Sequence, residues 1–86
     1  MKKRFNIRFD NEGPNALSYE LGTNARLQCT VENGVPVVWV NREGARVLAE
    51  IFAKLALGTH ATGFHVHLGR DLDPDGPDVV RLALAE

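Results

Sequence analysis

Apolar and polar residues alternate in the first part of the chain. The alternation from Phe5 to Phe9 predicts a strand over residues 3–10 with its apolar residues on one face. Residues 11–15 are rich in Gly, Pro and Asn and indicate a turn. The segment 16–21 alternates too, and its pattern leaves open whether it forms a short strand or a loop.

The strongest turn signal is Asn33–Gly34, which lies between two apolar, alternating runs. A two-residue hairpin turn takes positive φ at both central positions, which Asn and Gly tolerate best. The sequence therefore predicts strands over residues 25–32 and 35–40, paired so that Glu32 lies opposite Val35.

This register assigns the side chains of the hairpin to two faces, because directly opposed residues point the same way. The predicted core face comprises Leu27, Cys29, Val31, Val38 and Val40. Val37 and Trp39 fall on the other face, so we expect the single tryptophan to lie outside the main core. A bulge at Pro36 would exchange the two faces.

A helix is predicted over residues 41–57. Asn41 is a favourable N-cap, Gly58 suits the position after the helix, and Gly44 in the first turn is mildly unfavourable. The expected apolar stripe comprises Leu48, Ile51, Phe52 and Leu55. Four charged residues are expected to face water, namely Arg42, Arg46, Glu50 and Lys54.

Residues 63–69 alternate again, and here the polar positions are His65 and His67. An acidic loop over residues 70–78 and an apolar run over residues 79–85 complete a second predicted hairpin. We expect Val80, Leu82 and Leu84 to point inward and Arg81 outward. The predicted fold is a two-layer α+β domain, in which one helix covers one face of a four- to five-stranded, mainly antiparallel sheet.

Composition narrows the class of protein. The 86 residues suffice for one domain, residues 1–86, with an ordinary hydrophobic fraction of 44% and a net charge of −1. The charges are mixed and form no basic stripe, so we expect no nucleic-acid partner. We expect neither a signal peptide nor a membrane span, because no long apolar run is present. The one cysteine excludes an internal disulfide, in keeping with a cytoplasmic location.

Three kinds of site are considered. His65 and His67 lie two residues apart on one strand face and could share a metal ion, with His60 as a third ligand. The acidic loop matches the front half of a calcium loop, but Leu82 stands where the bidentate glutamate is required. Cys29 is expected in the core, where a thiol is inert, so nucleophilic catalysis has little support.

The open face of the predicted sheet is a further candidate, as a contact surface for another protein. Aromatic and arginine residues beside modest apolar area are typical of such surfaces. The expected members are Val37 and Trp39, together with Arg8, Gln28, Thr30, His65, His67 and Arg81.

The second half of the chain resembles immunity protein family 32 of the bacterial polymorphic toxin systems. The resemblance rests on the helix from Gly44 to Leu57, the motif His65–Val66–His67–Leu68, the turn Leu72–Asp73–Pro74 and the terminal run Val79–Leu84. Gly76 and Pro77 stand where the family typically has a serine. The resemblance implies a cytoplasmic protein without catalytic activity or cofactor, which binds and neutralises a cognate toxin.

If the partner is a toxin with a basic site, the acidic loop could mimic its substrate. The acids concerned are Asp71, Asp73, Asp75 and Asp78. Two alternatives remain open at this point. One is a metal-binding domain or small metal-dependent enzyme that uses His60, His65 and His67, and the other is a homodimeric structural module.

Overall fold

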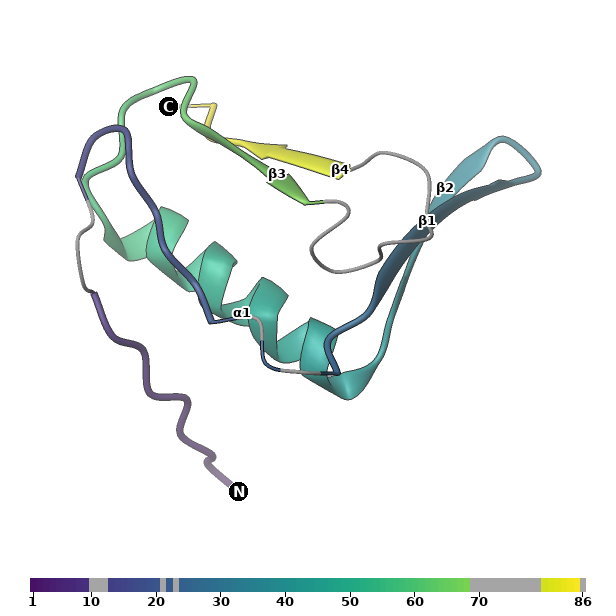
Figure 1. Cartoon of the computed structure of the whole chain (residues 1–86), viewed down its shortest axis with the longest axis horizontal. Coiled ribbons are helices and arrows are strands. Elements are labelled where there is room, and N and C mark those ends of the chain that lie inside the picture. The colour runs from purple at the N-terminus through teal and green to yellow at the C-terminus, as the bar shows by residue number, and fades with distance from the viewer. Residues whose placement is uncertain (10–12, 21, 23, 69–79, 86) are drawn as a thin grey trace.

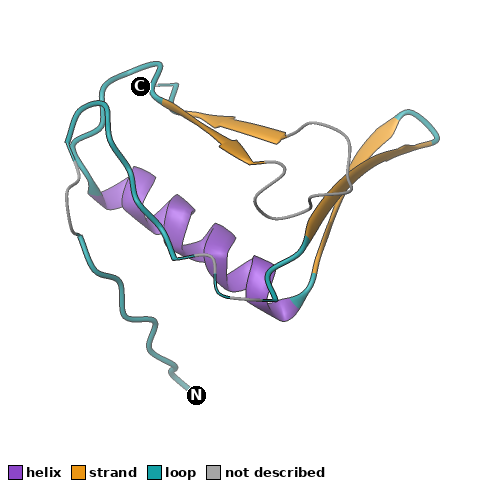
Figure 2. Ribbon diagram, in the orientation of Figure 1, coloured by secondary structure: helices purple, strands orange, loops and turns teal. Residues whose placement is uncertain are grey.

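The protein is a small α+β fold (Figures 1 and 2). The computed structural model describes residues 1–9, 13–20, 22, 24–68 and 80–85. Over these ranges the chain forms two antiparallel two-stranded sheets and one helix. The elements in chain order are β1 (Leu27–Glu32), β2 (Val35–Val40), α1 (Arg42–Leu57), β3 (His65–Leu68) and β4 (Val80–Ala83).

The register predicted for the first hairpin is confirmed. Glu32 pairs with Val35, and the pairing continues without a bulge to Leu27 and Val40. Asn33 and Gly34 have φ values of 51° and 79°, as a type I′ turn requires. The local turn chemistry therefore determines which residues of β1 and β2 face each other.

The helix begins where predicted. Asn41 has extended backbone angles, and its Oδ1 accepts a hydrogen bond of 2.8 Å from the Gly44 amide. The same oxygen accepts a 2.9 Å bond from the Arg26 amide, so Asn41 also ties the base of β1 to the helix. Gly44 is required here, because a Cβ at this position would collide with the Arg26 carbonyl oxygen.

The buried stripe of α1 differs from the predicted one. Its buried members are Gly44, Val47, Ile51 and Lys54. Leu48 and Leu55 are only half-buried, and Phe52 is exposed. The prediction that Lys54 faces water was wrong, because its side chain lies under the segment that contains Ser18. Gly58 caps the helix in an extended conformation with φ −85°.

The core lies between α1 and the β3–β4 hairpin, and the start of β1 closes one end of it (Figure 1). Its buried apolar residues are Ala25, Leu27, Val47, Ile51, Val66 and Leu68. Leu17 and Tyr19 pack against this cluster from a segment without strand structure, so residues 16–20 form the loop alternative left open by the sequence.

The second hairpin follows the predicted alternation. Val66 and Leu68 of β3 are buried, while His65 and His67 are exposed. On β4, Val80 and Leu82 are half-buried and Arg81 is exposed, as predicted. The strands are shorter than the predicted runs 63–69 and 79–85 over the residues described.

The single four- to five-stranded sheet that we predicted is not confirmed. Among the described residues β1 pairs only with β2, and β3 only with β4. In each sheet the two paired strands are consecutive in sequence, so local pairing is enough to form it. Joining two hairpins into one sheet depends on long-range contacts, and an alternating sequence pattern does not predict these.

Residues 3–9 were wrongly predicted as a strand. They have no strand structure, and they pass alongside α1 (Figure 1). The Phe9 ring lies 5.9 Å from the Lys54 ammonium. A helix offers no free ladder of backbone groups, so an alternating segment placed against it stays irregular although its side chains make contacts.

Candidate protein-binding surface

The β1–β2 hairpin extends away from the core, beyond the end where α1 begins (Figures 1 and 2). Much of the hairpin face that we predicted to lie in the core is therefore exposed to solvent. Leu27 is buried and Cys29 half-buried at its base, but Val31, Val38 and Val40 are exposed. The prediction that all five line the core was therefore wrong for these three valines, because this part of the hairpin extends away from the core.

Trp39 lies on the opposite face of the hairpin, as predicted, and 52% of it is exposed. Its indole Nε1 donates a 2.9 Å hydrogen bond to Oγ1 of Thr30, which stands on the neighbouring strand. This bond fixes the ring across the strand pair. A rigid aromatic side chain of this kind loses little conformational entropy when a partner covers it.

Two valines share this face with the tryptophan. Val35 is exposed and Val37 half-buried, and both alternate with Trp39 along β2. We call these three residues the Trp39 face. At the foot of the strand pair there is an open hollow of about 300 Å³, lined by Arg26, Leu27, Gln28, Trp39, Val40 and Asn41. The Trp39 face thus offers an aromatic ring beside a depression that a partner side chain could enter.

The predicted histidine pair forms as the alternation indicates. The rings of His65 and His67 lie 4.8 Å apart between centroids, edge to face, on the exposed side of β3. Arg81 pairs with His67 across the β3–β4 ladder and is also exposed. These three polar residues therefore share one face of the second hairpin.

His60 does not join the other two histidines. It is buried, its Nε2 lies 2.8 Å from the Ala16 carbonyl oxygen, and its ring stacks on Phe64 at 4.7 Å. Phe64 directly precedes His65, and adjacent side chains of an extended chain point to opposite sides. His60, which stacks on Phe64, therefore lies on the inner side of this hairpin, away from His65 and His67. Within the described ranges no three His, Cys, Asp or Glu residues are placed to hold a metal ion.

Cys29 is half-buried at the base of the hairpin. Burial raises the pKa of its thiol above the ordinary value, because desolvation disfavours the thiolate. The thiol is therefore a weak nucleophile in this environment.

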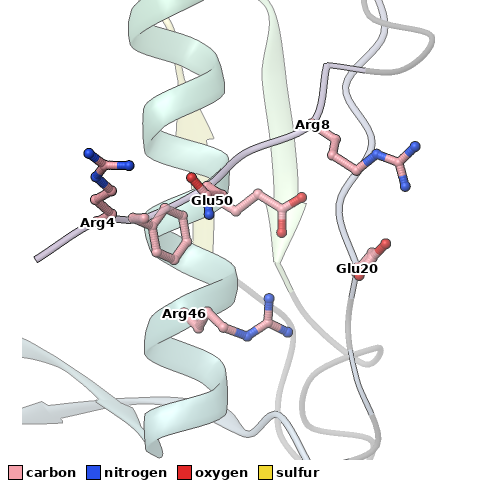
Figure 3. A pocket seen from close by; sticks show the side chains of 7 residues that line it. Arg4, Arg8, Glu20, Arg46 and Glu50 are labelled. Carbon is pink, nitrogen blue, oxygen red and sulfur yellow. The ribbon is translucent and has the colours of Figure 1, made fainter.

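A charged cleft that the sequence did not indicate lies between the N-terminal segment and α1. Its volume is about 310 Å³, and its lining comprises Arg4, Phe5, Asn6, Arg8, Glu20, Arg46 and Glu50. Figure 3 shows the Glu50 carboxylate between Arg8 and Arg46, while Arg4 points away from them. Three arginines and two glutamates line this cleft, so their formal charges leave a net charge of +1.

No family model, curated protein or solved structure matches the chain. The resemblance to immunity protein family 32 thus stays a prediction from sequence. No helix in the described part of the chain has the length and apolar character to cross a bilayer.

The structure divides the surface that the sequence predicted. Val37 and Trp39 lie on the first hairpin, whereas His65, His67 and Arg81 lie on the second, in a different sheet. The acidic residues Asp71, Asp73, Asp75 and Asp78 lie outside the described residues. Sequence reasoning did not identify the exposed valines of the first hairpin as surface residues. An alternating apolar run predicts a core face, and the sequence does not give its distance from the helix.

Proposed function

We propose that the protein is a non-enzymatic binding protein that contacts a partner protein through the Trp39 face of the β1–β2 hairpin. The observation that carries this proposal is the exposed tryptophan, held by Thr30 on a hairpin that projects from the core. Exposed apolar residues gathered on one projecting element are typical of interaction surfaces. Tryptophan is also among the residues that most often dominate binding energy.

The resemblance suggests what kind of partner this is. In the form it implies, the chain is a cytoplasmic immunity protein and the partner is a toxin delivered between competing bacteria. Blocking a toxin requires a complementary surface rather than catalytic groups. The weak nucleophilicity of the half-buried Cys29 thiol is consistent with such a passive role.

Affinity capture tests the proposal. The tagged chain is exposed to lysate of its own host, and bound proteins are identified by mass spectrometry. We expect one protein in equimolar amount with the wild type. Trp39→Ala should weaken its binding by roughly thirtyfold, since a central aromatic residue commonly contributes about 2 kcal/mol.

The chain offers a matched control. Phe52 is also a half-exposed aromatic residue, 54% against 52% for Trp39, but it stands on α1. Phe52→Ala should therefore leave capture unchanged. Equal capture by both variants would contradict a role for the Trp39 face, and absence of any partner under toxin-expressing conditions would contradict the binding function itself.

The captured protein then tests the toxin hypothesis. Its expression alone should arrest growth of a susceptible strain, and co-expression of the wild-type chain should restore growth. Trp39→Ala should restore it less well than Phe52→Ala at equal expression. A captured protein that leaves growth unaffected would retain the binding function and remove the immunity role.

A further inference from the structure

The outer face of the second hairpin carries two histidines whose rings lean toward each other. His65 and His67 stand two residues apart on β3, and both are exposed. Residues at this spacing on a strand are about 6.6 Å apart along the backbone. Their ring centroids are 4.8 Å apart, so the two side chains converge above the strand.

The separation of the two rings suits a shared metal ion. An ion bound to an imidazole nitrogen lies about 2.0–2.1 Å from that atom, and thus about 3.2 Å from the centre of the ring. Two imidazoles on one ion therefore have centroids about 4.5 Å apart when their bonds to the ion meet at a right angle, and about 5.2 Å apart at the tetrahedral angle. The observed 4.8 Å falls within this range.

A backbone hydrogen bond prepares His65 as a ligand. Its Nδ1 lies 3.2 Å from the Gly63 carbonyl oxygen. A carbonyl oxygen only accepts, so Nδ1 carries the hydrogen, and in the neutral ring Nε2 keeps a free lone pair. Histidines that bind metals usually donate their other N–H to a carbonyl or carboxylate in this way, which orients the ring and leaves one nitrogen for the ion.

His67 is placed to supply the second nitrogen. The two rings now meet edge to face, and among the described residues the ring nitrogens of His67 have no hydrogen-bond partner. Rotation about its Cβ–Cγ bond can therefore bring a nitrogen to the same ion as Nε2 of His65 without loss of a hydrogen bond. His65 also lines an open hollow of about 420 Å³, which leaves room for water on the ion.

One neighbour opposes the binding of a cation. Arg81 stands opposite His67 in the ladder and is exposed on the same face. Opposed residues have Cβ atoms about 4.5–5.5 Å apart, so the guanidinium is close enough to repel an ion on the histidines. Solvent and salt screen this repulsion at an exposed position. Position 81 is therefore where a change of charge should be felt most at the site.

We propose that His65 and His67 together bind one divalent transition-metal ion, with water in its remaining positions. Within the described ranges no third His, Cys, Asp or Glu stands beside the pair. Imidazole nitrogens favour Cu²⁺, Ni²⁺ and Zn²⁺ over Mg²⁺ and Ca²⁺, and Cu²⁺ is bound most tightly in this series. The site lies on the second hairpin, so this inference does not depend on the Trp39 face or on the proposed function.

Calorimetric titration of the tag-free chain tests the site. We expect one Cu²⁺ per chain, weaker binding of Zn²⁺ and no binding of Mg²⁺. His65→Ala and His67→Ala should each weaken Cu²⁺ binding about tenfold or more, because even the loss of a residue that supports a metal ligand typically costs about tenfold. Both positions are exposed, and circular dichroism checks that the variants are folded.

A cysteine variant serves as the matched control. The thiol of Cys29 is the other soft ligand of the chain, but it lies half-buried on the first hairpin. Cys29→Ser should therefore leave Cu²⁺ affinity unchanged. Two ions per chain, or full affinity in either single-histidine variant, would show that the histidines do not share an ion and would overturn the proposal.

Arg81→Glu tests the position of the ion. It replaces a repelling cation by a carboxylate opposite His67, so Cu²⁺ affinity should rise about tenfold or more. Arg81→Gln removes the charge alone and should give a smaller gain. Equal affinity in the wild type and Arg81→Glu would place the ion away from this face and overturn the proposal.

The third histidine provides an internal control in the wild type. Cu²⁺ added well below equimolar amount should broaden the imidazole NMR signals of His65 and His67 before those of His60. His60 is buried against Phe64 on the inner side of the hairpin. Equal broadening of all three histidines would contradict a site at the exposed pair.

Discussion

At the scale of single residues, Lys54 shows how a charged side chain can be structural. Only 2% of it is exposed, and its Nζ donates a 2.6 Å hydrogen bond to the Ser18 carbonyl oxygen. The Glu50 carboxylate lies 3.5 Å away, and the Phe9 ring lies above the ammonium. Lys54 of α1 thus holds two segments that form no strand, one containing Phe9 and the other Ser18.

Truncation of Lys54 should therefore be strongly destabilising. We expect Lys54→Ala to lower the free energy of unfolding by about 3 kcal/mol, because it removes a buried stem and leaves the Ser18 carbonyl without this donor. Lys54→Met keeps the stem and should lower it by about 1–2 kcal/mol. Urea denaturation measures both. The exposed Arg42→Ala serves as control, and an equal loss in Lys54→Ala and Arg42→Ala would show that burial of the lysine contributes nothing.

At the scale of elements, the junction of β2 and α1 depends on Asn41. Its Oδ1 accepts from two amides, those of Arg26 and Gly44, and its Nδ2 donates to the Asn24 carbonyl. The N-cap of the helix is therefore also the clamp at the base of the hairpin. The orientation of the hairpin relative to α1 follows from these bonds.

Asn41→Ala should lower the free energy of unfolding by about 1–2 kcal/mol, since it removes the cap and leaves the Arg26 amide without its acceptor. Asn41→Asp keeps an acceptor oxygen at the helix N-terminus and should lose less. Thermal unfolding followed by circular dichroism compares the two variants. If Asp is as harmful as Ala, the acceptor oxygen is not what stabilises this junction.

At the scale of the whole molecule, stability is unevenly distributed. The buried apolar residues gather between α1, the start of β1 and the second hairpin. The remainder of the first hairpin lies outside this cluster and is held by its own ladder and turn. Regions with few buried contacts contribute least to global stability and are where binding surfaces are commonly found.

The same substitution at two valines tests this distribution. Val47 is fully buried in α1, with 0% exposed, whereas 59% of Val35 on the hairpin is exposed. Val47→Thr should lower the free energy of unfolding by about 1–3 kcal/mol, because a hydroxyl replaces a buried methyl group. Val35→Thr should change it by less than about 0.5 kcal/mol. A large loss in Val35→Thr would show that the hairpin belongs to the cooperative core.

Local chemistry in the sequence determined much of the fold. Asn33–Gly34 specifies the register of the first hairpin, because few other pairs tolerate positive φ twice in succession. Asn41 specifies where the helix begins. The alternation around His65 and His67 specifies which side of β3 faces water. Each of these properties depends on residues within a few positions of one another.

Only the tertiary structure decided how these elements combine. Alternation from Phe5 to Phe9 predicts a strand, but this segment lies against a helix, which offers no ladder. Lys54 is charged and lies in a charged helical pattern, yet the chain folds over it. The valines of the first hairpin are exposed because the hairpin extends away from the core, beyond the end where α1 begins. These outcomes depend on which surfaces meet across long sequence separations, and local periodicity carries no information on that choice.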